Sequence, residues 1–356
     1  MSRPAIECAA RIGGSRSHAG TAWRTGVVIA LMLASQPGGA APIEPPPHRP
    51  PAGVVRIWGT AQAQSQVQAW AADFAGLHPS LRIDTHLTGS DVGMAGLYTG
   101  QADIVLIGRE ATDSEIKAFE WVFRYRPTRI EVMTGSLATP GQSPALGVFV
   151  HRDNPLARLT LAQLDAVFGG EPRRAVPAIR TWGQLGLRGA WAQRPIRLYA
   201  PAAESGSGRF FRQVALGAST KMHWDALTEF AEPVHRAGSA DSAGRRILAA
   251  LAADRGGIAI ADLGTVPAAV KPLALATAAG GPYHRVTHAH LIAGRYPLGR
   301  RVYAYVNRPP GAPLDAGVAA FLRHILGPSG QRRIGAANGY LPLAASRIPT
   351  QLQSLE

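Results

Sequence analysis

The sequence predicts an α/β protein of two lobes, each a mostly parallel sheet flanked by helices, with the chain crossing twice between the lobes. One observation is that strand-like and helix-like segments alternate along the chain, beginning with a buried strand at Val54–Trp58. Another is that the turns between them are short and rich in glycine and hydroxyl side chains. The third is length, because roughly 300 residues after the N-terminal segment suffice for two cores.

The first predicted lobe begins with two units of strand, turn and helix. After the first strand, apolar residues recur at spacings of three and four, as on one buried helix face: Val67, Trp70, Phe74 and Leu77. The second unit has alternating residues over Ile83–Leu87, a turn at Gly89–Asp91, a short helix to Tyr98 and a strand at Asp103–Ile107. Because such units predict parallel strands, we expect a ligand site beyond their carboxyl ends.

The second predicted lobe repeats this alternation. Its elements are strands at Leu146–Val150, Ile196–Ala200 and Gly257–Ala261, a helix at Leu161–Phe168, a turn at Glu204–Gly208 and a helix from Arg209. A strand at Arg301–Val306 and a helix at Ala316–Ile325 then return to the first lobe. We therefore expect lobe 1 at residues 54–146 and 290–345, lobe 2 at 147–289, and a C-terminal tail at 346–356.

The N-terminal segment has the layout of a secretory signal peptide. Four arginines precede a short apolar run, Val27–Ala34, which ends in small residues, so we expect residues 1–41 to be removed with cleavage near Ala40 or Ala41. Residues 42–53 are dense in proline and predict an extended linker. The apolar run is too short to span a bilayer, so the mature chain is expected to be periplasmic or secreted, without a membrane span. The one cysteine, Cys8, precedes the run, so no disulfide is expected.

The chain is strongly basic, with a formal net charge of +14. The first 40 residues carry four Arg and one Glu, so their removal leaves +11. The positive electrostatic field of such a chain favours an anionic ligand or an anionic surface. The alternative interpretation is that the arginines are scattered over the surface and solvated.

Three turns between a strand and a predicted helix carry the residues of an anion site. They are Gly59-Thr60-Ala61, Gly89-Ser90-Asp91 and Ser205-Gly206-Ser207. The first N–H groups of a helix have no intrahelical acceptor, the helix dipole is positive there, and a hydroxyl adds a donor. A Ser or Thr before a helix is also an ordinary N-cap, so the hypothesis depends on three such turns meeting.

Other function classes find little support in the residues. Neither Ser205 nor Ser207 is flanked as G-x-S-x-G requires, so a serine hydrolase is not expected. His288 and His290 lack a cluster of further ligands, which favours an edge strand over a metal site. Arginines beside aromatic residues, as in Arg124–Arg126 and Arg300–Tyr303, could bind nucleic acid, but a signal peptide removes the chain from intracellular nucleic acid, so we interpret them as surface or lobe-crossing residues. We expect no enzyme activity, no cofactor, no metal and no nucleic-acid partner.

Several segments, in order, resemble one known family. They are TGSDVGMAGLYTGQADIVLIGRE (88–110), VHRDNPLARLTLAQLDAVFGG (150–170), ESGSGRFF (204–211), RGGIAIADLG (255–264), YPLGRRVYAYV (296–306) and GYLPL (339–343). They are similar to segments of PstS-like phosphate-binding proteins of ABC transporters, in the type II periplasmic-binding-protein superfamily. The resemblance covers residues 54–343 and implies the two-lobed periplasmic-binding-protein fold.

The resemblance also implies which residues contact the ligand. Carried over by position, these are Gly59, Thr60, Ala61, Gly89, Ser90, Asp91, Ser205, Gly206 and Ser207. Gly108 stands where relatives carry Ser or a proton-accepting Asp, and Pro201–Glu204 replaces a segment that often holds an Arg and an Asp. Arg109 is the candidate to supply the missing charge, with a surface or inter-lobe salt bridge as the alternative.

Three neighbouring charged residues have their own predicted roles. Arg209 is expected to point to solvent along its helix. Asp91 and Glu204 are interpreted as helix caps, with acceptance of a ligand proton as the alternative.

The implied function is capture of phosphate or a related tetrahedral oxyanion in an inter-lobe cleft, for delivery to an ABC permease by a monomeric receptor. The alternative is a secreted or surface sensing or adhesion protein of the same fold that has lost phosphate specificity.

Overall fold

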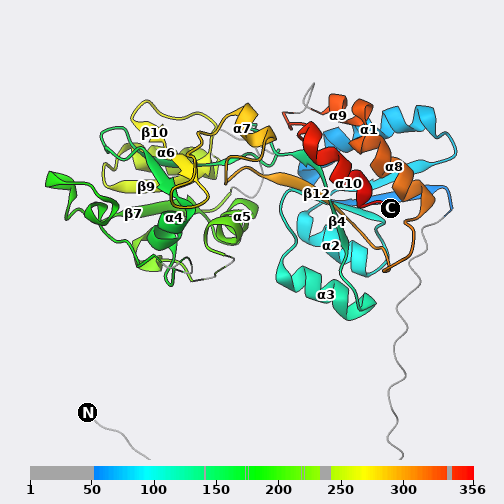
Figure 1. Cartoon of the computed structure of the whole chain (residues 1–356), viewed down its shortest axis with the longest axis horizontal. Coiled ribbons are helices and arrows are strands. Elements are labelled where there is room, and N and C mark those ends of the chain that lie inside the picture. The colour runs from blue at the N-terminus through cyan, green and yellow to red at the C-terminus, as the bar shows by residue number, and fades with distance from the viewer. Residues whose placement is uncertain are drawn as a thin grey trace, which may run out of the picture. The chain divides into compact units, whose positions relative to one another are not determined.

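The computed structural model describes residues 52–139, 142–172, 174, 176–217, 219, 221–232, 242–334 and 339–356. The predicted signal peptide and residues 42–51 of the predicted linker lie outside the described residues. The described chain forms two five-stranded sheets, with helices on both faces of each, and a small two-stranded sheet (Figure 1). The predicted α/β class is confirmed.

The first sheet has the strand order β2-β1-β3-β12-β4. Its strands are β1 (Val54–Gly59), β2 (Arg82–His86), β3 (Ile104–Ile107), β4 (Thr128–Thr134) and β12 (Arg301–Val306). β1 pairs in parallel with β2 and β3, whereas β12 is antiparallel to both β3 and β4. The sheet is therefore mixed rather than mostly parallel.

The helices of the first lobe cover both faces of this sheet (Figure 1). They are α1 (Gln64–Leu77), α2 (Ser90–Tyr98), α3 (Asp113–Phe123), α8 (Ala316–Leu326), α9 (Pro328–Arg333) and α10 (Ile348–Gln353). One core contains the apolar faces of α1 and α8, and the core on the opposite face contains those of α2 and α3. The predicted stripe of α1 is confirmed at Val67, Trp70 and Phe74, which are fully buried, but Leu77 is exposed.

The second sheet has the order β10-β5-β9-β7-β8. Its strands are β5 (Leu146–His151), β7 (Arg197–Pro201), β8 (Leu227–Phe230), β9 (Gly257–Asp262) and β10 (Val270–Pro272); β6 (Arg158–Thr160) and β11 (Ala274–Ala276) form the small sheet. β7 is parallel to β8 and β9, and β5 is antiparallel to β9 and β10, so this sheet is also mixed.

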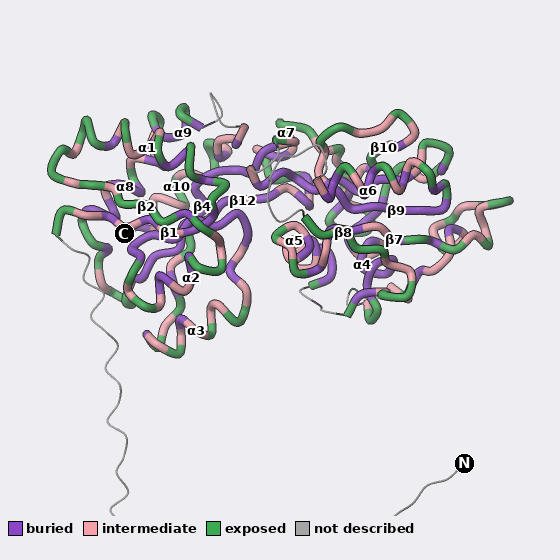
Figure 2. Tube along the Cα trace, turned by 180° about the vertical axis from the view of Figure 1, so that it is seen from behind, coloured by how far each residue is buried: buried purple, intermediate pink, exposed green. Residues whose placement is uncertain are grey.

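The helices of the second lobe are α4 (Leu161–Phe168), α5 (Gly206–Ala215), α6 (Ala243–Ala252) and the short α7 (His288–Ile292). Along β5, Val148 and Val150 enter the core shared with α4 and α5, whereas Phe149 enters the core shared with α6. Because side chains alternate between faces and both faces are covered, the strand is a continuous apolar run. Figure 2 shows the central strands of both sheets as buried.

The chain changes lobe beside the carboxyl ends of parallel strands. It enters the second sheet at Leu146, which pairs with Asp262 at the end of β9. It re-enters the first sheet in β12, whose early residue Tyr303 pairs with Ile107 at the end of β3. A strand that enters at this edge must run antiparallel to its neighbours, which explains the mixed sheets and places Arg300 at the predicted ligand edge.

Three predicted details differ from the structure. Helix α5 begins at Gly206, not at Arg209, because Ser205 is its N-cap. Residues 346–356, predicted as a tail, contain α10, and Leu355 is buried in the core of α1 and α8. His288 and His290 lie in α7 rather than in an edge strand.

Among the described residues, no helix is both long and apolar enough to cross a bilayer.

Candidate functional site

The first predicted turn is held against the end of β3. Gly59 has φ +139°, and a Cβ at this position would overlap the carbonyl group of Leu106, so only glycine fits. The next residue, Thr60, donates its N–H to the Leu106 carbonyl oxygen at 2.9 Å. Thr60 is 7% exposed, and its hydroxyl has no hydrogen-bond partner within the described part of the chain.

The second predicted turn lies directly beside the first. The N–H of Gly89 donates to the Gly59 carbonyl oxygen at 2.9 Å. In the first turn of α2, a Cβ on Gly93 would lie 2.9 Å from the Gly59 Cα, so the helix start packs on the first turn. Ser90 is the first residue of α2, and no side chain caps this helix. The first N–H groups of α2 thus remain available beside Thr60.

The third predicted turn opens α5. The hydroxyl oxygen of Ser205 accepts the Gly208 N–H at 3.0 Å, which makes Ser205 the N-cap. A Cβ on Gly208 would overlap the Ala202 carbonyl oxygen, so the helix start is fixed close to the end of β7. The N–H groups of Gly206 and Ser207 precede the first intrahelical hydrogen bond and remain free to bind a ligand.

Arg300 connects the third turn to the first lobe. Its Nε donates to the Gly108 carbonyl oxygen at 3.2 Å, directly after β3. Its Nη1 lies 3.5 Å from the Ser207 hydroxyl, and its Nη2 lies 3.4 Å from the Gly206 carbonyl oxygen. These last two contacts are at the outer limit of hydrogen bonding. The two lobes therefore meet around one guanidinium group.

Arg300 is a buried cation whose described contacts include no carboxylate. It is only 6% exposed, and its guanidinium lies 5.1 Å from the centre of the Phe210 ring. Burial is the main cause that lowers the pKa of Arg300 to about 10; Arg109 acts in the same direction and Tyr340 opposes it. A pKa of about 10 still leaves the side chain charged at neutral pH.

Ser143 explains why the first lobe needs glycine at position 108. Its backbone has φ +47°, which is uncommon for a residue other than glycine, and it is fully buried. Its N–H and hydroxyl lie 3.2 and 3.1 Å from Oε1 of Gln62, and the Tyr340 hydroxyl donates to the Gln62 carbonyl oxygen at 3.0 Å. A Cβ on Gly108 would overlap the Ser143 hydroxyl. The serine hydroxyl thus fills the space that a side chain at position 108 would need.

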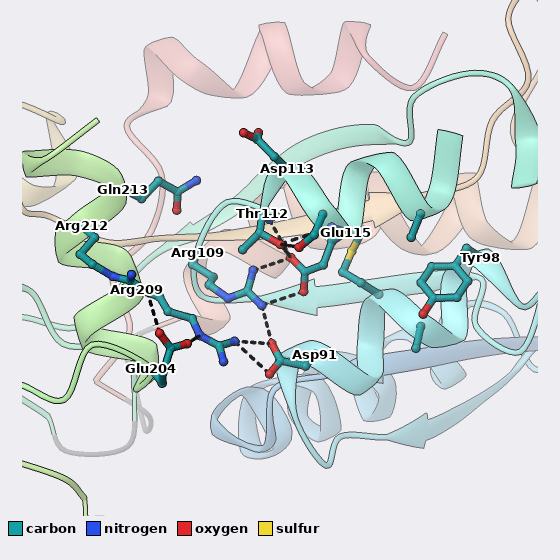
Figure 3. A pocket seen from close by; sticks show the side chains of 14 residues that line it. Asp91, Tyr98, Arg109, Thr112, Asp113, Glu115, Glu204, Arg209, Arg212 and Gln213 are labelled. Atoms are coloured by element: carbon teal, nitrogen blue, oxygen red, sulfur yellow. Dashed lines mark hydrogen bonds and ion pairs between the residues drawn. The ribbon is translucent and has the colours of Figure 1, made fainter. Parts of the chain in front are cut away.

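Arg109 is held by carboxylates of its own lobe (Figure 3). Its Nη1 and Nη2 lie 2.7 and 2.8 Å from the two Glu115 oxygens, and Nη2 also lies 2.7 Å from Asp91 Oδ1. Burial alone would lower the pKa of Arg109, but Glu115 and Asp91 outweigh it and raise the pKa. Arg109 thus forms a salt bridge, but a buried one within its own lobe rather than the surface or inter-lobe one expected, and its charge is already compensated by two carboxylates.

Arg209 reaches from α5 to the first lobe. Its Nη1 lies 3.0 Å from both carboxylate oxygens of Asp91, as Figure 3 shows. The prediction that Arg209 points to solvent is therefore wrong. Asp91 and Glu204 are not side-chain caps either, because Asp91 pairs with Arg109 and Arg209, and Glu204 pairs with Arg209 and Arg212.

A cavity of about 660 Å³ lies beside this ion cluster. Its lining combines the charged groups of the cluster with apolar side chains such as Met94 and Ala118 of α2 and α3. The lining includes Asp91 and Arg109 but none of the predicted hydroxyls, so the cavity and the three turns are neighbours rather than one site. In the part of the chain that the structure describes, no group of three or more His, Cys, Asp or Glu side chains could hold a metal ion.

The sequence pattern does not identify Arg300, Ser143 or Gln62 as residues next to the turns. Arg300 contacts both lobes, as predicted, but it is buried rather than at the surface. The sequence feature that indicates a role for Arg300 is its position directly before the strand that returns to the first lobe. No local sequence pattern predicts the contact between Ser143 and Gln62, because the two residues are 81 positions apart.

Comparisons with known proteins identify the family and the fold. A family model described as "PBP superfamily domain" matches residues 44–329. The chain is 31% identical over 288 residues to the phosphate-binding protein PstS of Pseudomonas aeruginosa, covering 80% of this chain and 82% of the relative. Two solved structures share the fold. PstS of Borrelia burgdorferi has a TM-score of 0.55 at 16% identity, covering 82% of this chain and 99% of that one. An ABC-type phosphate transport receptor of Vibrio cholerae has a TM-score of 0.52 at 19% identity, covering 81% and 99%.

Proposed function

Since this chain belongs to the PBP superfamily, and to the same family as the phosphate-binding protein PstS, we propose that it is an extracytoplasmic receptor for phosphate or a related tetrahedral oxyanion. It holds the anion between its lobes and delivers it unchanged to an ABC permease. The observation that supports the proposal is that the first two turns lie side by side in the first lobe, while buried Arg300 contacts both Gly108 of that lobe and the third turn in the second lobe.

The available donors match an oxyanion in kind and in number. They are the hydroxyls of Thr60, Ser90 and Ser205 and the first N–H groups of α2 and α5. Micromolar affinity needs about 8 kcal/mol, and each hydrogen bond to a charged group contributes about 1.5 to 3 kcal/mol. A handful of donors from both lobes therefore suffices after the cost of closure.

The same chemistry supports binding without catalysis. The turns offer donors to an anion, and neither Ser205 nor Ser207 has the glycines two residues before and after it that a nucleophile elbow requires. The basic mature chain attracts anions to the receptor. Export through the N-terminal segment, action as a monomer and a permease partner complete the proposal.

Calorimetry on the mature chain tests the proposal directly. Phosphate should bind with at least micromolar affinity and raise Tm, and sulfate and molybdate serve as comparison oxyanions. Absence of any oxyanion binding tighter than about millimolar would contradict the proposal.

A pair of cap substitutions separates ligand contact from helix stability. Ser205 caps α5 and Ser242 caps α6, and each accepts the backbone N–H three residues on. Ser205→Ala and Ser242→Ala should each cost about 1 kcal/mol of stability. Only Ser205→Ala should weaken phosphate binding, by roughly tenfold or more, because it also removes a donor to the charged ligand. Equal affinities in the two variants would exclude Ser205 from the site.

A further inference from the structure

Among the described residues two arginines are buried, Arg109 and Arg300, and Arg300, unlike Arg109, contacts no carboxylate. Arg109, 3% exposed, is paired with Glu115 and Asp91, whereas the described contacts of Arg300 are the Gly108 and Gly206 carbonyl oxygens, the Ser207 hydroxyl and the Phe210 ring. A buried charge without an opposite charge is strongly unfavourable. The site is therefore built to receive a negative charge from outside the chain.

The direction in which Arg300 points gives the place of that charge. Its Nη1 and Nη2 face the first two residues of α5, Ser207 and Gly206, at 3.5 and 3.4 Å. The N-terminal end of a ten-residue helix is positive, so a guanidinium aimed at it is repelled unless an anion lies against both.

The hydrogen-bonding capacity of Arg300 leads to the same place. A guanidinium has five N–H donors, and the described contacts of Arg300 use one on each nitrogen. Two donors on the Nη atoms are left for a ligand, in the planar arrangement that binds two oxygens of an oxyanion together.

We infer that Arg300 binds the oxyanion directly, as the cation that neutralises it between Gly108 of the first lobe and the first turn of α5. This inference rests on the proposed function. It assigns the charge-matched partner to a residue outside the three turns, since Pro201–Glu204 lacks an arginine and Arg109 is held by carboxylates.

Titration calorimetry with inorganic phosphate on Arg300→Gln and Arg300→Lys tests the assignment. Arg300→Gln should weaken binding by roughly tenfold to a hundredfold, because it removes charged hydrogen bonds. Arg300→Lys keeps the charge but not the planar pair of donors, so its affinity should fall between wild type and Arg300→Gln. The matched control is Arg301→Gln, which removes the neighbouring charge that hydrogen-bonds to Thr134, and its affinity should stay within about twofold of wild type.

A second measurement avoids any loss of folding in the variants. In ¹⁵N-labelled wild-type protein, the Nε–H resonance of Arg300, identified by its absence from the Arg300→Lys spectrum, should shift on addition of phosphate. If wild type binds phosphate while the resonance stays in place and both Arg300 variants keep wild-type affinity, the assignment is overturned and the proposed function stands. If wild type does not bind phosphate, the proposed function itself fails.

Discussion

The ion pair between Asp91 and Arg209 should stabilise the approach of the two lobes. Asp91 belongs to α2 and Arg209 to α5, so the pair exists only when the lobes are together. The perturbation is Arg209→Gln, which removes the cross-lobe contact and leaves the pair of Asp91 with Arg109 in place. The matched control is Arg212→Gln on the same helix, because Arg212 pairs with Glu204 of its own lobe.

The exposure of the two side chains sets the expected magnitude. The Asp91 side chain is 65% exposed and that of Arg209 is 31% exposed, so solvent screens much of their attraction. Such pairs contribute about 0.3 to 1 kcal/mol. If the contact forms with closure, its loss should raise Kd for phosphate by up to about fivefold, mainly through faster dissociation, and the effect should shrink at high salt.

The assay is a double-mutant cycle of Asp91→Asn and Arg209→Gln, with Kd from calorimetry and the dissociation rate from stopped flow. The cycle removes the direct effect of each charge on the anion and leaves the coupling between the two residues. We expect coupling of about 0.5 kcal/mol that is absent when Arg212→Gln replaces Arg209→Gln. Strict additivity of the two substitutions would refute the role of this pair in closure.

The pH dependence of the same pair follows from the pKa of Asp91. Burial alone would raise this pKa, but Arg209 and Arg109 outweigh it and lower the pKa below 3.8. A carboxylate whose pKa is lower in the folded than in the unfolded protein stabilises the fold at any pH above its unfolded-state pKa. This contribution is lost as pH falls through the folded-state pKa. The difference in stability between wild type and Asp91→Asn should therefore be constant near neutral pH and shrink below about pH 4.

Three further substitutions and one control test the packing of the fold. Gly208→Ala forces the start of α5 away from the preceding turn, so it should lower both Tm and phosphate affinity. The control is Gly76→Ala in α1, where a Cβ would meet open space, and it should raise Tm slightly. Asp254→Asn weakens the hydrogen-bonded pair with Arg197 and should cost about 2 kcal/mol in urea unfolding at pH 7. Burial alone would raise the pKa of Asp254, but the hydrogen bonds from Arg197 outweigh burial and lower it. The cost of Asp254→Asn should therefore decrease as pH falls below about 4, and an equal cost at pH 3 would contradict this. Leu355→Ala should cost about 2 to 4 kcal/mol, and a change below about 0.5 kcal/mol would show that the residue following α10 does not contribute to the core.

Local patterns were sufficient to predict the elements that their own residues determine. Helix α4 has the predicted bounds, Leu161–Phe168, because Thr160 and Gln163 form a capping box within the segment. Strand β12 also has its predicted bounds, since its five residues after Arg301 form a buried run. The start of α5 was predicted too late because Gly206 and Gly208 have low helix propensity, and the cap at Ser205 together with close backbone packing overrides it.

The sequence by itself determined the α/β class, the order of the elements and the three turns, because strand runs, helix stripes and glycine turns are properties of neighbouring residues. Only the tertiary structure decided where the charges go. Arg109 finds its partner Asp91 18 residues away, and Arg300 lies against Gly108 from 192 residues away. Whether an arginine is neutralised by a carboxylate or buried without one depends on the antiparallel return of β12 and on the contact between lobes, and no local pattern carries that information.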